Sequence, residues 1–278
     1  MRLARHGAVG AEAPIASIME GVWHDLRPVT ADITAAFLGT HLRDLDVAAL
    51  PVVEHVDRFG APLADVGKIV CVGVNYLRHA AEAGTDAPSE PILFLKASDT
   101  VIGADDEVLI PRGATKTDWE VELALVIGRT ARYLDSPEQA PDHIAGYTIS
   151  NDVSERTFQL ERGGQWDKGK NCETFNPIGP WLATVDEVPD PQNLGLRLWV
   201  NGQLRQDSNT ANMIFGVNHL VWYISQFMVL RPGDVINTGT PHGVALGSPD
   251  QCYLKAGDVM ELEIDGLGRQ RQLLRQSR

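Results

Sequence analysis

The stretch that decides the fold is Trp119-Glu120-Val121-Glu122-Leu123-Ala124-Leu125-Val126. Its composition predicts a strand, and because side chains alternate between the faces of a strand, Glu120 and Glu122 are expected to point the same way. A second strand-like run, Gly146-Tyr147-Thr148-Ile149-Ser150-Asn151, ends at Asp152. Three carboxylates brought together repel one another unless a cation lies between them, and oxygen ligands suit Mg²⁺ or Mn²⁺. For a Glu-x-Glu pair alone, the exposed face of an edge strand is the simpler interpretation.

The chain is rich in strand-like segments from Lys68 onward. They are residues 68–73, 92–96, 107–111, 120–127, 145–150, 196–200, 234–237 and 259–264. Turns such as Asn201-Gly202 and Pro232-Gly233 separate them, without regular strand–helix alternation. One helix is predicted between Met213 and Met228, where apolar residues recur at helical spacing. The sequence therefore predicts a mainly β (α+β) protein built as a β-sandwich or rolled sheet.

Residues 1–65 differ from the rest of the chain. Short strand-like pieces at residues 15–17 and 21–25 precede a helical stretch near residues 33–45 and the prolines Pro51 and Pro62. This order predicts a small N-terminal domain over residues 1–65 and a larger, strand-rich domain over residues 66–278.

Composition narrows the classes of partner. The 278 residues carry a net charge of -13, which argues against nucleic acid or an anionic membrane as the main partner. Three scattered cysteines form no zinc module, and reduced thiols are typical of a cytoplasmic protein. No signal peptide is apparent, and the most apolar stretch, residues 213–230, is too polar to span a bilayer.

Further candidate residues follow the first strand of the larger domain. Asn75 to Gly84 is predicted to be a short helix with Asn75 as its N-cap. His79 and Glu82 lie three residues apart on one face of it. A carboxylate beside an imidazole can orient it as a general base, although an incidental surface ion pair is the simpler interpretation of two such residues alone.

Two other segments carry polar residues. Asp152 to Pro180 is predicted to be a long irregular segment in which Arg156 and Lys170 could hold a carboxylate or stabilise an enolate. The turn Gly239-Thr240-Pro241 could bind an anionic oxygen. Taken separately, the two cations are more simply surface charges and the turn a plain tight turn.

Taken together, these segments resemble the fumarylacetoacetate hydrolase family over roughly residues 66 to 265. The matching pieces, in order, are Asn75-Tyr76 with His79 and Glu82; Phe94-Leu95-Lys96; Glu120-x-Glu122; Asn151-Asp152-Val153-Ser154 with Arg156 and Gln159; Lys170 before Phe175-x-Pro177-x-Gly179-Pro180; Met213-Ile214-Phe215; and Gly239-Thr240-Pro241-x-Gly243-Val244. The stretch Phe158 to Lys170 is similar to members that act on 2,4-diketo-3-deoxy sugar acids.

The resemblance implies a mixed β-sandwich roll, a homodimer and an enzyme. It implies the following site residues: Mg²⁺ or Mn²⁺ on Glu120, Glu122 and Asp152; catalytic roles for His79, Glu82 and Lys170; and substrate contacts from Tyr76, Lys96, Arg156, Gln159 and Thr240. The expected reaction is metal-dependent hydrolysis of a C–C bond in a 2,4-dioxo acid, giving pyruvate and a second acid. Oxaloacetate decarboxylation, isomerisation of an oxo acid at the same site, and a non-catalytic metal- or sugar-acid-binding protein are the alternatives.

Overall fold

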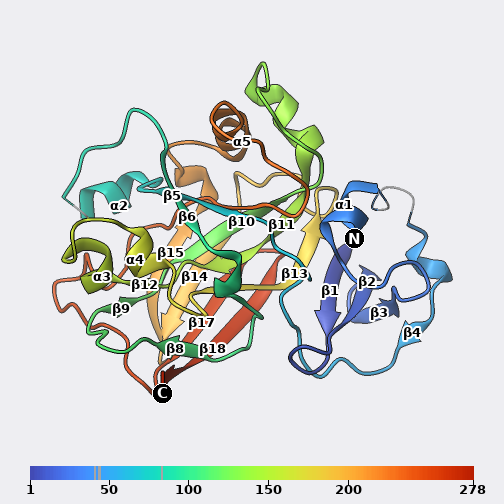
Figure 1. Cartoon of the computed structure of the whole chain (residues 1–278), viewed down its shortest axis with the longest axis horizontal. Helices are drawn as coiled ribbons and strands as arrows, with labels where there is room; N and C mark the ends of the chain where they lie inside the picture. The colour runs from blue at the N-terminus through green and yellow to red at the C-terminus, as the bar shows by residue number, and fades with distance from the viewer. Residues whose placement is uncertain (41, 43–44, 83) are drawn as a thin grey trace.

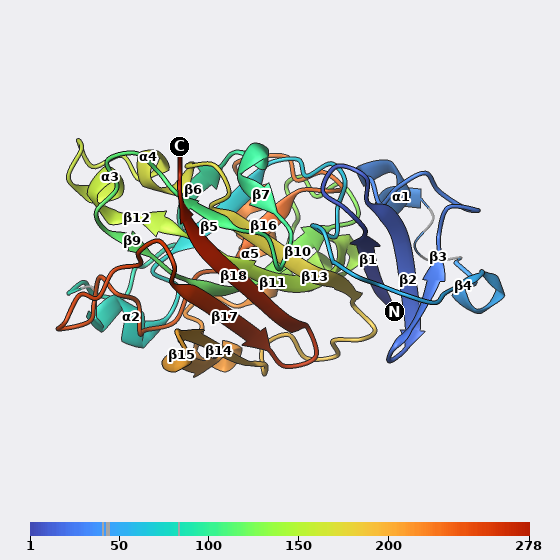
Figure 2. The ribbon, with the colours of Figure 1, turned by 90° about the horizontal axis from the view of Figure 1, so that it is seen from below.

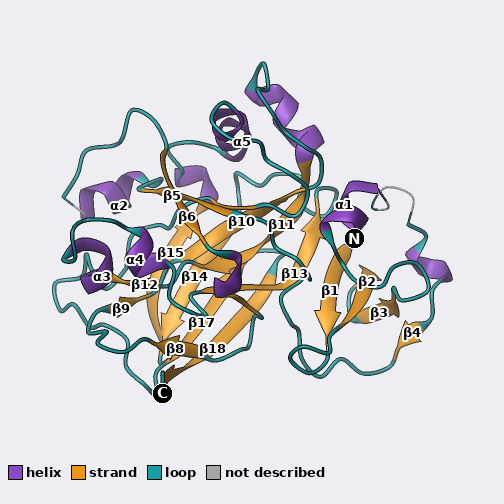
Figure 3. Cartoon of the chain, in the orientation of Figure 1, coloured by secondary structure: helices purple, strands orange, loops and turns teal. Residues whose placement is uncertain are grey.

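The structure, a computed structural model, describes residues 1–40, 42, 45–82 and 84–278. Strands fill its centre and the helices lie around them (Figure 3). The strands of the large sheet are, in spatial order, β4 (Val52–Val53), β3 (Val22–Asp25), β2 (Ala13–Met19), β1 (Arg2–His6), β13 (Asn176–Thr184), β11 (Ile144–Asn151), β10 (Val121–Ile127), β16 (Val235–Asn237), β5 (Ile69–Gly73) and β6 (Ile92–Lys96), with β7 (Val101–Ile102) beside β13. Most neighbours are antiparallel, but β16–β5 and β13–β7 are parallel, so the sheet is mixed.

A second sheet packs against the first (Figure 2). Its strands are β15 (Gln203–Asn209), β14 (Gly195–Val200), β17 (Val259–Ile264), β18 (Gly268–Gln276) and β8 (Val108–Ile110); a separate pair is formed by β12 (Ser154–Glu155) and β9 (Thr117–Asp118). The mainly β class with mixed sheets, predicted from the sequence, is confirmed.

The alternation of β10 divides the interior into two cores. Val121, Leu123 and Leu125 belong to a core that includes apolar residues of β14 and β17, while Ala124 and Val126 belong to a second core shared with the N-terminal strands. Glu122 has the parity of Ala124, so it faces away from the core between the sheets. The strand thus buries apolar residues on both faces and carries its carboxylates only at its beginning.

The helices are short. They are α1 (Ala35–Thr40), α2 (Leu77–Glu82), α3 (Arg156–Leu160), α4 (Asp167–Lys170) and α5 (Val217–Ser225), with 3-10 segments at Val47–Ala49, Ser98–Thr100, Pro137–His143 and Thr210–Asn212. Helices α2, α3 and α4 gather at the end of the molecule farthest from β1–β4 (Figure 1; Figure 2). None of the helices within the described residues has the length and apolarity of a membrane span.

The structure corrects three predicted helix boundaries. The helix predicted over 213–228 is only α5, because Gly216 takes an extended conformation at its start and Gln226 caps its end. The helix predicted over 33–45 is described as α1; residues 41, 43 and 44 of that prediction lie outside the described residues. Asn75 does not cap α2, because its amide group instead bonds to backbone groups of Phe215 and Thr238.

The segment 152–180 is less irregular than predicted, since it contains β12, α3, α4 and the beginning of β13. Strand β1 pairs with β13, with Arg2 opposite Ala183, so the N-terminal strands extend the large sheet. The division of the chain near residue 65 stays a prediction.

Candidate active site

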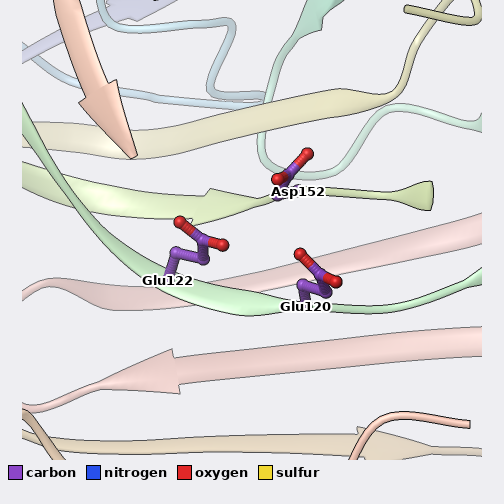
Figure 4. Close-up of side chains that lie close together, drawn as sticks. All are labelled: Glu120, Glu122 and Asp152. Carbon is purple, nitrogen blue, oxygen red and sulfur yellow. The ribbon is translucent and has the colours of Figure 1, made fainter. Parts of the chain in front are cut away.

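The antiparallel register of β10 and β11 brings the three predicted carboxylates together. Val121 lies opposite Asn151, and the backbone N–H of Asp152 donates to the carbonyl of Glu120 over 3.0 Å. Opposed residues of an antiparallel pair share a face, and so do residues two apart on one strand. Asp152, Glu120 and Glu122 therefore project into the same space (Figure 4). One oxygen from each carboxylate lies within 4.8 Å of the others, and all three residues are buried.

Three buried cations surround these carboxylates. Lys170 donates from Nζ to Glu120 and to Asp152, at 2.8 Å each. Arg156 donates to Glu120 at 2.7 Å, and Lys96 contacts the other oxygen of Asp152 at 2.5 Å. Buried charges need such partners, because leaving one unpaired is strongly destabilising.

The acids differ in their electrostatic surroundings. Burial opposes ionisation of Glu120, but the positive charges of Lys170 and Arg156 prevail and lower its pKa to about 2. Burial, with the negative charges of Asp152 and Glu120, raises the pKa of Glu122 well above its usual value. Glu122 accepts a hydrogen bond from the backbone N–H of Gly239 at 2.7 Å, and no cationic side chain within the described residues forms an ion pair with it.

The donor set fits a hard divalent cation. Three converging carboxylates offer oxygen ligands, and Glu122 lacks the positive partner that Glu120 and Asp152 have. With all groups of the cluster ionised, as when a metal is bound, the four acids Asp118, Glu120, Glu122 and Asp152 exceed the three cations Lys96, Arg156 and Lys170 by one negative charge. Mg²⁺ or Mn²⁺ would supply the missing positive charge and make the cluster attractive to an anion.

The imidazole and carboxylate predicted on one helix face do lie together. His79 Nδ1 is 3.3 Å from a carboxylate oxygen of Glu82 on α2, and both carboxylate oxygens of Glu82 accept from the backbone N–H of Gly243, at 3.0 and 3.1 Å. The turn that begins with Gly239 therefore fixes Glu82, and Glu82 in turn orients the imidazole. With Nδ1 facing the carboxylate, Nε2 is the ring nitrogen left to accept a proton.

A single cavity of about 210 Å³ joins these groups. Its lining residues include all three carboxylates and the predicted residues His79, Arg156, Gln159, Lys170 and Thr240. Lys96 contacts the cavity-lining Asp152 from a fully buried position. Tyr76 is 1% exposed, and no described residue offers its hydroxyl a hydrogen-bond partner; burial and the nearby charge of Glu122 raise its pKa. The substrate contacts expected of Lys96 and Tyr76 stay predictions.

Asp118 belongs to the site, although it is not among the residues predicted from the sequence. This buried carboxylate accepts from Arg156 Nε at 2.8 Å and from the backbone N–H groups of Ala245 and Leu246, at 2.8 and 3.0 Å. It therefore joins the guanidinium to the turn after β16. Its position two residues before Glu120 is the only sequence signal that could have pointed to it.

Comparison with known proteins places the chain in a family. The family described as Fumarylacetoacetate (FAA) hydrolase C-terminal matches residues 68–275, and the chain belongs to it. A Burkholderia ambifaria protein named "Putative hydrolase" is 50% identical over 283 residues, covering 100% of both chains.

Two solved structures show the range of activities among similar proteins. Maleylpyruvate hydrolase from Sphingobium sp. SYK-6, in complex with manganese(II) ion and pyruvate, is 28% identical with a TM-score of 0.82. The 5-carboxymethyl-2-hydroxymuconate delta-isomerase from Mycobacterium smegmatis is 32% identical with a TM-score of 0.79. In both comparisons 100% of each chain is covered.

Proposed function

We propose that this protein is a divalent-metal-dependent hydrolase that cleaves the C3–C4 bond of a 2,4-dioxo acid, releasing pyruvate and a carboxylic acid. The observation that carries the proposal is the single cavity lined by the three carboxylates, His79 and Lys170. The manganese and pyruvate in the similar maleylpyruvate hydrolase support it.

Glu120, Glu122 and Asp152 would hold Mg²⁺ or Mn²⁺, and their buried carboxylates suit either ion. When bound, the ion would act as a Lewis acid toward the oxygens of the oxo acid. Lys170 and Arg156 keep Glu120 ionised, so the site is ready to accept the cation.

His79 is assigned the role of general base. Glu82 accepts from Nδ1, so Nε2 can take a proton from water. The resulting hydroxide attacks the C4 carbonyl, the C3–C4 bond breaks, and its electron pair passes to C3 as the enolate of pyruvate. The imidazolium then returns its proton to C3, which completes the balance of one water consumed.

Lys170 lies on the floor of the cavity between Glu120 and Asp152. Burial by itself would lower the pKa of Lys170, but the negative charges of Asp152 and Glu120 raise it. The side chain therefore remains an ammonium. A fixed positive charge beside the reacting carbons would stabilise the enolate as it forms. Arg156, Gln159 and Thr240 line the same cavity and would orient the oxo-acid end.

Isomerisation of an unsaturated oxo acid is the second candidate, supported by the similar delta-isomerase. It would need a proton moved between carbons and no water attack. Decarboxylation of oxaloacetate would also need no water attack, and therefore no His79–Glu82 base. The products separate the three reactions: pyruvate with an acid, an isomer alone, or pyruvate with carbon dioxide.

The decisive experiment incubates the protein and Mn²⁺ with acetylpyruvate, a 2-hydroxymuconate-type dienoic acid and oxaloacetate, with and without EDTA, and identifies products by chromatography. The proposal expects metal-dependent release of pyruvate and acetate. Formation of an isomer as the only product would favour the isomerase. Release of carbon dioxide from oxaloacetate, without turnover of the other compounds, would favour the decarboxylase. Tight Mn²⁺ binding without turnover of any compound would favour a binding protein. We also propose the homodimer that the resemblance implies, which sedimentation equilibrium would test.

A further inference from the structure

We propose that the acyl half of the substrate is neutral and apolar, such as an alkyl or aryl acylpyruvate, and is neither a second carboxylate nor a polyhydroxylated chain. This rests on the proposed function and names the substrate class of the same cavity. The apolar composition of the cavity wall and the pairing of the charges that line the cavity support this substrate class.

The cavity has a charged floor and an apolar wall. The wall is formed by Val72, Val74, Phe94, Leu160, Trp166 and Leu246. The cavity has a volume of about 210 Å³, whereas one water molecule requires roughly 10–15 Å³. A ligand of several heavy atoms therefore fits beyond the carboxylates.

Trp166 is held against the wall by packing. A Cβ atom at position 73 would come within 2.6 Å of the Trp166 indole. The indole can occupy this position because residue 73 is glycine. The indole meets the ring of Phe94 edge-on with centroids 5.5 Å apart, and the ammonium of Lys170 lies 5.1 Å from the centroid of the Phe94 ring. The aromatic wall therefore begins directly beside the charged floor, where the acyl half of a bound oxo acid would start.

The positive charges lining the cavity are already paired. Arg156 bonds to Asp118 and Glu120, and Lys170 to Glu120 and Asp152. Among the cavity-lining residues, all of them described, no further lysine or arginine occurs, and Arg78 on the exposed side of α2 is not one of them. A second carboxylate at the far end of the substrate would thus lose water without gaining a free cation.

Hydroxyl groups on the acyl chain would also find few partners. Thr85 bonds to the carbonyl of Ala80, and Thr240 both donates to the carbonyl of Val121 and accepts from Gln206. A methylene buried against the wall instead gains about fourfold in affinity.

The test on the wild-type protein compares two ligands that cannot be cleaved at C3–C4. The compounds 2-oxohexanoate and 2-oxoadipate have chains of equal length and differ in ending in a methyl or a carboxylate. Calorimetry on the Mn²⁺-loaded protein is expected to show at least tenfold tighter binding of 2-oxohexanoate. Equal or tighter binding of 2-oxoadipate would overturn the inference.

Two variants of the cavity wall and one control variant test which residues cause the preference for 2-oxohexanoate. Trp166→Ala should reduce the preference for 2-oxohexanoate several-fold, while Phe227→Ala, which removes an aromatic ring 63% exposed and outside the cavity, should leave it unchanged. Leu160→Lys adds a cation at a half-exposed wall position and should tighten 2-oxoadipate binding. If neither wall variant changed the ratio, the assignment of this wall would be wrong.

A turnover series distinguishes this inference from the proposed function. Pyruvate release from butanoylpyruvate should exceed that from fumarylpyruvate or a 2,4-diketo-3-deoxy sugar acid by about tenfold or more in kcat/KM. The reverse order would overturn the inference and leave the hydrolase intact. No pyruvate from any compound would overturn the hydrolase, while the calorimetric preference would still decide the character of the wall.

Discussion

Asp118 shows how one buried residue can connect two parts of the site. Its carboxylate accepts from the guanidinium of Arg156 and from backbone N–H groups at 245 and 246. Arg156 in turn donates to Glu120, so the position of a proposed metal ligand depends on an acid that lines no part of the cavity surface. Groups of this kind commonly tune affinity or activity without touching the ligand.

We expect Asp118→Asn to lower kcat/KM about 10- to 100-fold, because Arg156 loses its charged partner and Glu120 is less firmly held. Steady-state kinetics with an acylpyruvate, together with Mn²⁺ titration, would measure the loss. Asp207→Asn, at a side chain 59% exposed, is the matched control. A variant with parental kinetics would show that Asp118 has a purely structural role.

His79→Ala should lower kcat about 10²- to 10⁴-fold while Mn²⁺ affinity stays near the parental value, because the imidazole is assigned to proton transfer and not to the metal. Glu122→Ala should lose both activity and metal binding. Kinetics and calorimetry on the two variants would separate the roles. Parental turnover by His79→Ala would remove it from the mechanism.

At the scale of the elements, sequence indicated the strand faces but not the pairing between strands. The two-residue spacing of Glu120 and Glu122 is a local property, so their shared orientation could be predicted. The pairing that sets Asp152 opposite Glu120 is a contact between different strands, and only the family resemblance suggested it.

Strand β13 contains two prolines and is not predicted from the sequence. Pro177 and Pro180 lack the N–H that a central strand normally donates, so the sequence of this segment is atypical of a strand. The register with β11 shifts between the pairs Tyr147–Ala183 and Ile149–Gly179, so Pro180 falls in the unpaired stretch. Such a shift depends on the partner strand and leaves no local pattern.

The contact between β11 and β13 gives a test of stability. A side chain at Gly146 would come within 2.1 Å of the carbonyl oxygen of Ala183, which is backbone and cannot move aside. We expect Gly146→Ala to lower the free energy of unfolding by about 1–3 kcal/mol, measured by urea denaturation. Gly39→Ala, which lies in α1 and whose nearest neighbour would be at 3.5 Å, should leave the free energy of unfolding unchanged or raise it by up to about 1 kcal/mol. Equal stability of the two variants would contradict the close approach.

For the whole molecule, metal binding and folding are linked. An ion that binds only the folded carboxylate cluster stabilises the protein by about 2.7 kcal/mol at 100 times its Kd. We therefore expect Mn²⁺ to raise the Tm by several degrees and EDTA to reverse the increase, as measured by calorimetry. Glu122→Ala should show no increase; the same increase in that variant would place the ion elsewhere.

The pairing of β1 with β13 has a consequence for synthesis on the ribosome. Strand β1 can pair with β13, where Arg2 lies opposite Ala183, only after most of the polypeptide has emerged from the ribosome. Until then the edge of β1 that faces away from β2 is unpaired. An open edge of this kind invites pairing with other nascent chains. A pause in translation before residue 176 should therefore promote aggregation, whereas a pause after β13 has left the ribosome should not.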